Sequence, residues 1–406
     1  MKRVKKISDE NLLMIVLAFL AFSIGIWGNY RQLWLEDVGF TLIGISKLFS
    51  VALICSAIIS FIISLFSYKI KIKDIVLLSI LMRSISMVIL LFTSNMFIIK
   101  TMMLLCIMCE VIFAIAFYPL LTYITKTDES YRKKTLIEYF ARDIGIVSCG
   151  LLIGVSLGKF VFNYDTCLLI STFASLLSMV FLAMFNHKEK HKKVESLTKS
   201  FKELLSNKIN KVFLTNQLII NISYGIVFDL MMLILTNYIN FEVSLASVFI
   251  IVCNVLGSIF ASIFSKYGKN LSISVSSIIK FGTRSLGYFV AFTMNNITSF
   301  IIAIVVAYIS SRILEDKVTG KFLQIIDEEN QFLYGNIRYF VACIGEGIGT
   351  FLAGVLIGYS FRVLFLGAAI VTLIQTIILI YLGKLSKNCW FFSIFIVLLT
   401  RSLFLV

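Results

Sequence analysis

The chain has 406 residues, of which 59% are hydrophobic and only 15% are charged, and its formal net charge is +15. In soluble domains about a quarter of the residues are charged, so this composition excludes a soluble globular protein and indicates a membrane protein. A bilayer core about 30 Å thick needs roughly 20 apolar residues per helix, which gives a chain of this length room for on the order of a dozen crossings.

Apolar runs between polar or charged breaks predict the membrane-spanning helices. In chain order the runs cover residues 12–30, 44–66, 75–93, 96–123, 138–160, 166–185, 212–238, 244–264, 272–293, 297–314, 336–358 and 361–383. The first run follows four basic residues, as a signal peptide would, but we interpret it as a retained helix. The predicted fold class is therefore an all-α polytopic membrane protein with twelve transmembrane helices.

The distribution of Lys and Arg predicts the orientation in the membrane. With the N-terminus inside, the inner side holds 25 of these residues as far as Lys387, and the outer side, with the outer ends of the spans included, holds four. Basic connections resist translocation, so both termini are predicted to be cytoplasmic, in a multi-pass protein of the cytoplasmic membrane. The positive charge is thus a topology signal that requires no nucleic-acid partner, and the basic loops are expected to contact the lipid bilayer. The richness in Ile, Lys and Asn is typical of a bacterial protein.

Short stretches of the first half recur in the same order about 200 positions later. The matching stretches are Ser23, Gly25 and Ile26 with Ser223, Gly225 and Ile226; Ile63–Lys71 with Ala261–Lys269; Arg83–Ile85 with Arg284–Leu286; and Ile137–Gly145 with Ile337–Gly345. Four matches in chain order indicate a tandem duplication.

An even number of helices in each copy makes the two copies run parallel. The predicted organisation is an N-terminal six-helix bundle over residues 1–185, a basic cytoplasmic linker with an amphipathic segment over 186–211, a C-terminal six-helix bundle over 212–385, and a hydrophobic tail over 386–406. We interpret the tail as an accessory segment, although it is long enough to form a thirteenth span.

With this repeat and topology, the chain resembles the major facilitator superfamily, in which two six-helix bundles are related by an axis along the membrane normal. The resemblance covers about residues 10–385. The family's loop motif, G-x-x-x-D-[RK]-x-G-[RK]-[RK], is better kept in the second half, where the matching positions hold Ala261, Ser265, Lys266, Gly268, Lys269 and Asn270. Serine replaces the motif's acid there, which puts the family's charge lock between helices in doubt.

The resemblance implies that the first, fourth, seventh and tenth spans line a central cavity. An ionisable side chain in the hydrocarbon costs roughly 2.5–3.5 kcal/mol or more, so each one needs a reason. The candidate residues for substrate binding or proton coupling are Glu110, Asp229, Asn221, Tyr224, Trp27, Asn29 and Arg312. Alternatives stay open for several: Glu110 could form a structural ion pair, Trp27 could belong to an interfacial belt, and Arg312 could extend to the inner surface.

Four further charges lie deep in the predicted spans. We interpret them as structural charges between helices: Arg83, Arg284, Asp143 and Glu346. Arg83 and Arg284 occupy matching positions in the repeat, which favours a shared scaffold role over ligand contact. Glycines at Gly145, Gly150, Gly154 and Gly158 let helices approach closely, and they resemble the glycine-rich motif of antiport members, although that motif normally carries a proline.

No catalytic or metal site is predicted. His187 and His191 lie in a lysine-rich loop without further ligands, Cys106 and Cys109 lie inside a span, and no G-x-x-x-x-G-K-[ST] phosphate loop is present. The prediction is a monomeric secondary transporter without cofactors that moves a small solute by alternating access, driven by the proton gradient. An apolar cavity favours export of an amphipathic compound. The alternatives are a membrane subunit of an ATP-driven complex and a non-transporting sensor or lipid scramblase.

Overall fold

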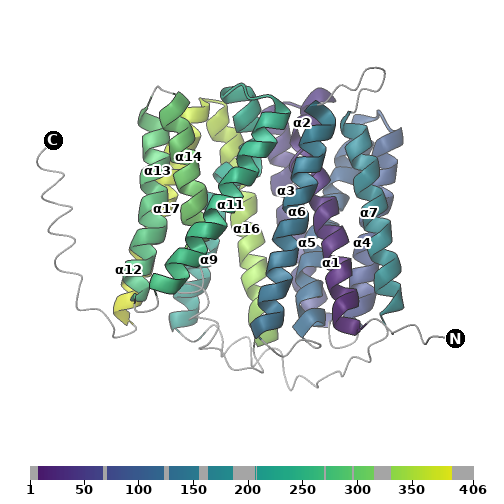
Figure 1. Cartoon of the computed structure of the whole chain (residues 1–406), viewed down its shortest axis with the longest axis horizontal. Helices are drawn as coiled ribbons and strands as arrows, with labels where there is room; N and C mark the ends of the chain where they lie inside the picture. The colour runs from purple at the N-terminus through teal and green to yellow at the C-terminus, as the bar shows by residue number, and fades with distance from the viewer. Residues whose placement is uncertain are drawn as a thin grey trace, which may run out of the picture.

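The computed structural model describes residues 8–66, 71–122, 128–154, 163–185, 206, 208–268, 271–294, 297–314 and 331–385. Within these ranges all regular secondary structure is helical, and the long helices stand side by side (Figure 1). The tail 386–406 and most of the linker 186–211 lie outside the described residues, so the segments predicted there stay predictions.

The first group of helices follows the predicted runs closely and adds one short helix. Its members are α1 (Asp9–Gly28), α2 (Arg31–Asp37), α3 (Leu42–Phe66), α4 (Ile72–Phe92), α5 (Met96–Thr122), α6 (Asp128–Gly154) and α7 (Tyr164–Met184). The α1 helix begins where the Ser8 hydroxyl accepts a hydrogen bond from the backbone N–H of Asn11 (3.3 Å), which satisfies one of the free donors at a helix start. The short α2 helix lies in a segment read from sequence as a connection.

In the second group, two of the predicted spans are broken. Its members are α9 (Lys208–Val227), η1 (Phe228–Leu230), α10 (Met231–Leu233), η2 (Ile234–Tyr238), α11 (Val243–Tyr267), α12 (Ile273–Ser277), η3 (Ile278–Gly282), α13 (Thr283–Thr293), α14 (Ile297–Arg312), α16 (Gln331–Ile357) and α17 (Phe361–Leu385). The seventh span changes from α-helix to a 3₁₀ turn at Phe228 and then to a π-helix. The ninth contains a π-helix at η3. Such interruptions occur often at functional sites.

The helices present apolar side chains on their outer faces. Among the described residues, nine helices are long and apolar enough to cross a bilayer, and α14 is a shorter apolar helix. On α7, Leu169 and Phe173 are 58% and 63% exposed, and on α17, Leu373 and Ile377 are 52% and 59% exposed. Large exposed side chains one helical turn apart form the kind of surface that lipid covers. Each of the twelve predicted runs overlaps an observed helix or series of helices.

The helices pack in two groups. In the first group α1 contacts α6 and α7, and α4 contacts α5 and α7; in the second, α9 contacts α16 and α17, and α13 contacts α14 and α17. The groups meet where α16 packs on α3 and α11 packs on α6. Figure 1 shows the first group, in purple and blue, on one side and the second, in teal to yellow, on the other, with α2 at the end opposite the N-terminus. We refer to that end as the α2 end.

Glycines repeat the same helix contact in both groups. A Cβ added at Gly25 would lie 2.2 Å from the backbone carbonyl oxygen of Arg142, and one added at Gly225 would lie 2.3 Å from that of Glu346. The glycines are 200 positions apart, whereas the residues that they contact are 204 apart. The packing of α16 on α9 is therefore displaced by about one helical turn from the register of the Ile337–Gly345 sequence match.

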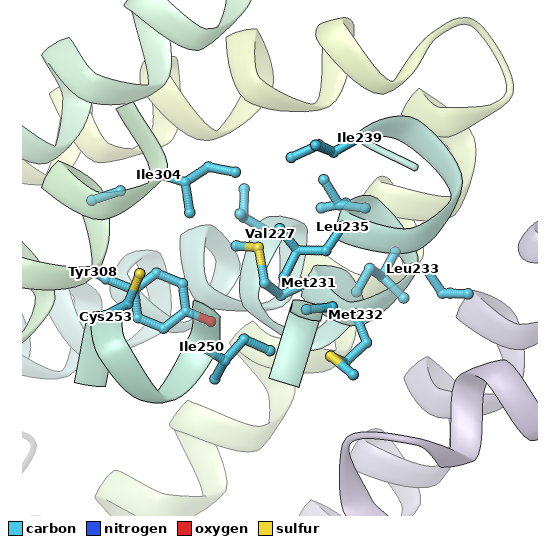
Figure 2. Packing of buried hydrophobic residues seen from close by; sticks show 14 of the residues in the cluster. Val227, Met231, Met232, Leu233, Leu235, Ile239, Ile250, Cys253, Ile304 and Tyr308 are labelled. Carbon is cyan, nitrogen blue, oxygen red and sulfur yellow. The ribbon is translucent and has the colours of Figure 1, made fainter. Parts of the chain in front are cut away.

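Around the broken seventh span lies an apolar cluster. Figure 2 shows side chains of this span packed with those of α11 and α14; the labelled residues include Val227, Met231, Leu235, Ile250, Cys253, Ile304 and Tyr308. All of these side chains are buried. The cluster packs around the interrupted helix and positions the groups on η1.

Candidate functional site

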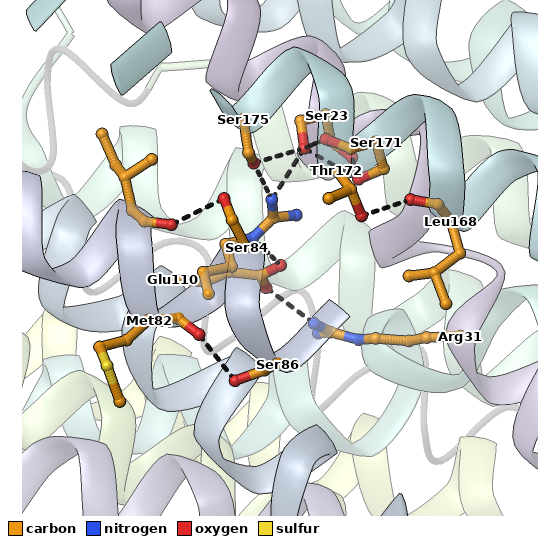
Figure 3. Close-up of polar contacts among 12 residues, drawn as sticks. Ser23, Arg31, Met82, Ser84, Ser86, Glu110, Leu168, Ser171, Thr172 and Ser175 are labelled. Carbon is orange, nitrogen blue, oxygen red and sulfur yellow. Dashed lines mark hydrogen bonds and ion pairs between the residues drawn. The ribbon is translucent and has the colours of Figure 1, made fainter. Parts of the chain in front are cut away.

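Glu110 lies between two arginines in the middle of the first group. Its carboxylate accepts hydrogen bonds from Arg31 Nη1 (2.7 Å) on α2 and from Arg83 Nε (3.0 Å) on α4 (Figure 3). The side chains of Arg83 and Glu110 are 1% and 11% exposed. A buried ion pair of this kind persists only where further hydrogen bonds satisfy the charged groups.

Arg83 makes those further bonds. Its Nη1 donates to the hydroxyls of Ser23 on α1 and Ser175 on α7, and the Ser23 hydroxyl donates to the carbonyl of Ser171 (2.7 Å). Together with Glu110 on α5, Arg83 thus joins four helices. These contacts support its predicted role as a structural charge between helices.

Asp229 lies on the 3₁₀ turn that interrupts the seventh span. Its carboxylate accepts a hydrogen bond from the Thr350 hydroxyl (2.6 Å) on α16, and its backbone carbonyl accepts one from Gln32 Nε2 (2.5 Å) on α2. The Glu346 side chain lies close enough to Asp229 for the two carboxyl groups to interact electrostatically. Two negative charges in one buried site repel each other, which favours the binding of a proton by one of the two groups. We call Asp229 and Glu346 the acid pair.

Cations of the first group face the acid pair. Arg31 and Arg142 are close enough to interact electrostatically with both Asp229 and Glu346. Arg142 also occupies, by its contact with Gly25, the position that Glu346 occupies in the second group. The two groups of helices therefore present opposite charges to each other near the centre of the molecule.

Arg284 has different surroundings from its repeat partner Arg83. Its Nε donates to the Tyr288 hydroxyl (3.1 Å), and its guanidinium lies 4.9 Å from the centre of the Phe228 ring and 5.6 Å from that of Tyr288. It is 4% exposed. In the described part of the chain no carboxylate lies within 4.0 Å of this guanidinium. Arg284 thus does not connect helices through an acid as Arg83 does.

The other candidates on the first and seventh spans lie in mixed surroundings. Tyr224 stacks on Phe228 with ring centres 4.9 Å apart. Trp27 is fully buried and packs edge-on against Trp34. Asn29 is half-buried. Asn221 donates to the Gln217 carbonyl of its own helix (2.7 Å).

Arg312 and Asp143 lie in a separate network between the two groups of helices. Arg312 donates to Asn254 Oδ1 (2.9 Å) and Ser258 Oγ (3.1 Å) on α11. Asn254 in turn donates to the Asp143 carboxylate (3.1 Å) on α6. This network joins α6, α11 and α14 rather than the central charges.

The loop-motif residues lie at the end of α11. Gly268 follows this helix, and a Cβ there would lie 2.5 Å from the Phe264 carbonyl oxygen, so the close turn favours glycine. Lys266 is exposed. The side chain of Ser265 and all of Lys269 lie outside the described residues, so their predicted role stays a prediction.

Sequence reasoning missed three residues of the central site. Arg31 and Gln32 fall just past the predicted first span and were read as an outer connection. Thr350 is an ordinary span residue in sequence, although it follows Glu346 by four positions, and that spacing places both on one helix face. A search for polar residues one turn from each buried acid would have found it.

The arrangement defines a class: a multi-pass α-helical membrane protein with buried charges where two groups of helices meet. The family model described as Major Facilitator Superfamily matches residues 8–314. The chain belongs to the Major Facilitator Superfamily, which confirms the resemblance noted from sequence and makes it a transporter of that type.

Solved structures agree on the fold. The chain is similar to a single-substitution mutant of the nucleoside transporter NupG, with a TM-score of 0.71, 13% sequence identity and coverage of 92% of this chain and 100% of that one. A second NupG structure gives a TM-score of 0.68 at 12% identity, covering 93% of this chain and 100% of that one. No curated protein matches the chain. At such low identity these structures establish the architecture alone.

Proposed function

We propose that the chain is a proton-coupled secondary transporter that moves a small solute across the cytoplasmic membrane by alternating access. The observation that carries the coupling is the acid pair: Asp229 lies at a helix interruption, and the neighbouring Glu346 on α16 is close enough to interact with it electrostatically. Interrupted membrane helices often form ion and substrate sites, because they offer backbone groups that a continuous helix uses internally.

Proton binding would change the attraction between the two groups of helices. Without its proton the acid pair carries two negative charges facing Arg31 and Arg142. With the pair protonated this attraction weakens, since only ionised carboxylates attract a guanidinium strongly. The protonated acid pair therefore favours a different balance of conformations from that favoured by the unprotonated pair.

Arg31 connects the acid pair with Glu110. It is hydrogen-bonded to Glu110 and also interacts electrostatically with Asp229 and Glu346. Glu110 and the acid pair therefore compete for one cation. We propose that Arg31 turns towards the acid pair when that pair loses its proton, which makes Glu110 a participant in coupling without being the group that takes up the proton.

The test separates coupling from transport itself. Proteoliposomes holding a pH-sensitive dye report proton movement when each solute of a panel is added, and counterflow of the labelled solute reports exchange without a gradient. Asp229→Asn is expected to keep counterflow but lose proton movement, because exchange needs no net proton release. The matched control is Asp74→Asn, which removes an exposed acid at the other end of the bundle. Proton movement at the wild-type rate in Asp229→Asn would rule out the acid pair.

Several finer features rest on sequence alone. These are cytoplasmic termini, the bacterial cytoplasmic membrane, a monomeric state and export as the direction of transport. The solved relatives are described as nucleoside transporters, so nucleosides belong in the solute panel. Loading the labelled solute inside or outside oriented vesicles tests the direction.

A further inference from the structure

The two repeat-related arginines differ in how their charge is balanced. Arg83 is paired with Glu110, whereas among the described residues the recorded contacts of the Arg284 guanidinium are the Tyr288 hydroxyl and two aromatic rings. The positions that correspond to Glu110 in the second group hold Ser310 and Ser311. Both hydroxyls donate to carbonyls of their own helix, from Ser310 to Ala307 and from Ser311 to Tyr308. The duplication has kept the arginine and lost its acid.

A buried guanidinium without a counter-charge is unfavourable, and ring faces compensate only part of the cost. Arg284 is 4% exposed, and in the part of the chain that the structure describes its Nη2 has no hydrogen-bond partner. Asp229 follows Phe228, the ring partner of Arg284, but its carboxylate accepts a hydrogen bond from the Thr350 hydroxyl (2.6 Å) on α16. Arg284 therefore has an unused donor and an unbalanced charge.

A second cation adds to the positive charge of this region. Lys280 lies four residues before Arg284, on the π-helix η3, and is 1% exposed. Its Nζ donates to the carbonyl of Ser311 (2.8 Å) near the end of α14. The negative end of a helix stabilises this ammonium but does not neutralise the guanidinium.

Aromatic side chains lie next to the guanidinium. The Phe228 ring covers it at 4.9 Å, stacks on Tyr224 (4.9 Å) and meets the edge of Tyr308 (4.8 Å). Phe228 is also the first residue of the 3₁₀ turn η1. A change at this turn would uncover the Arg284 guanidinium and expose aromatic faces beside it, a combination suited to an anion with a planar apolar body.

We infer that Arg284 is the anion-binding group of the solute site, and that the solute is a small organic oxyanion with a planar, apolar body. The inference rests on the proposed transport function and names its substrate class. The oxyanion would accept a charge-assisted hydrogen bond from Nη2 of Arg284. Its planar body would pack against Phe228 and Tyr224. The acid pair stays available for the proton.

Ligand-dependent thermal shift of the purified protein tests the inference without transport. The probes are sodium benzoate, sodium acetate and sodium phosphate, each against sodium chloride at equal ionic strength, and uridine as a neutral solute. Benzoate is expected to raise the melting temperature of the wild type more than acetate. In Arg284→Gln the apparent Kd for benzoate should rise roughly tenfold or more, since a charge-assisted bond is lost.

The matched control is Arg362→Gln. Arg362 Nε also donates to a tyrosine hydroxyl, that of Tyr238 (3.1 Å), but Arg362 lies near the start of α17. This variant should keep the wild-type Kd. If Arg284→Gln does not fold, Arg284→Lys is the variant that tests the inference. Lysine keeps the positive charge but lacks the planar guanidinium with its several N–H donors. Its apparent Kd should rise at least about threefold, and an unchanged Kd would overturn the inference.

The outcomes separate this inference from the proposed function. Stabilisation by phosphate alone, or by uridine alone, would overturn the organic oxyanion as substrate class and leave proton-coupled transport to be judged by the dye assay. No response to any of the three anions would overturn it as well. Benzoate binding that depends on Arg284, without proton movement in liposomes, would support the anion site and refute the coupling.

Discussion

Arg142 and Glu346 occupy the same packing position in the two groups of helices and carry opposite charges. Each places its backbone carbonyl against a glycine of the repeat, Gly25 for Arg142 and Gly225 for Glu346. The duplicated framework has thus diverged in charge at its centre, so that one group presents cations and the other acids. Electrostatic attraction between the groups follows from this divergence, and we propose that a proton on the acid pair controls it.

The glycine contacts predict a large effect of a single methyl group. Gly25→Ala should lower the free energy of unfolding by about 1–3 kcal/mol, because a Cβ 2.2 Å from the Arg142 carbonyl oxygen forces α1 and α6 apart. Gly282→Ala is the matched control, since its Cβ would meet only Ile278 at 3.7 Å. Urea unfolding in detergent micelles measures both. Equal effects of the two substitutions would contradict the close approach.

Glu110→Gln tests the ion pair in the first group. The substitution leaves Arg31 and Arg83 without their shared counter-charge, so we expect a loss of about 3 kcal/mol in the free energy of unfolding. The sequence prediction adds that this variant should lose transport driven by a pH gradient. Thermal unfolding and the dye assay measure the two effects separately. Undiminished coupling in a folded Glu110→Gln protein would remove Glu110 from the mechanism.

A pair of cysteines provides a test of the packing of α6 on α7. The Sγ atoms of Cys149 and Cys167 are 2.8 Å apart, and both side chains are fully buried. A mild oxidant should therefore join them in a disulfide. After denaturation, the oxidised protein should then have two fewer thiols that react with a maleimide. Mass spectrometry of the labelled protein counts the thiols. Cys149→Ser should abolish the change, whereas the solitary Cys343→Ser should not.

Much of the fold follows from the sequence because the bilayer fixes helix length. Each predicted run overlaps an observed helix, and Glu110 and Asp229 stood out since ionisable groups in apolar runs are costly. The break at Phe228 was not predicted because neither proline nor glycine marks it. Arg31 was missed because the predicted first span ended at residue 30, directly before the short helix α2 (Arg31–Asp37).

The sequence could not predict which side chains contact each buried charge. The repeat relates Arg83 to Arg284 by position, and from this we predicted a shared role. The neighbours differ, since Glu110 balances one arginine and Phe228 covers the other. The register of α16 also differs from its sequence match by a helical turn, because packing of glycines against carbonyls sets the contact.

Contacts at the α2 end predict how acidification changes the conformation. There Gln32 donates to the Asp229 carbonyl, and Asn237 donates to the Glu36 carboxylate (2.9 Å). Protonation of the acid pair weakens its attraction for Arg31, which follows Tyr30 at the start of α2. Lower pH should therefore separate the two groups of helices at this end.

The most direct measurement of the central claim is the distance between spin labels at Asp37 and Glu242, two exposed positions near the α2 end. Pulsed electron paramagnetic resonance in nanodiscs gives the distance distribution from mildly alkaline to mildly acidic pH. We predict that a longer component grows on acidification in the wild type and that Asp229→Asn combined with Glu346→Gln removes this dependence on pH. One unchanged distribution across the pH range in the wild type would contradict a proton-controlled, alternating-access transporter.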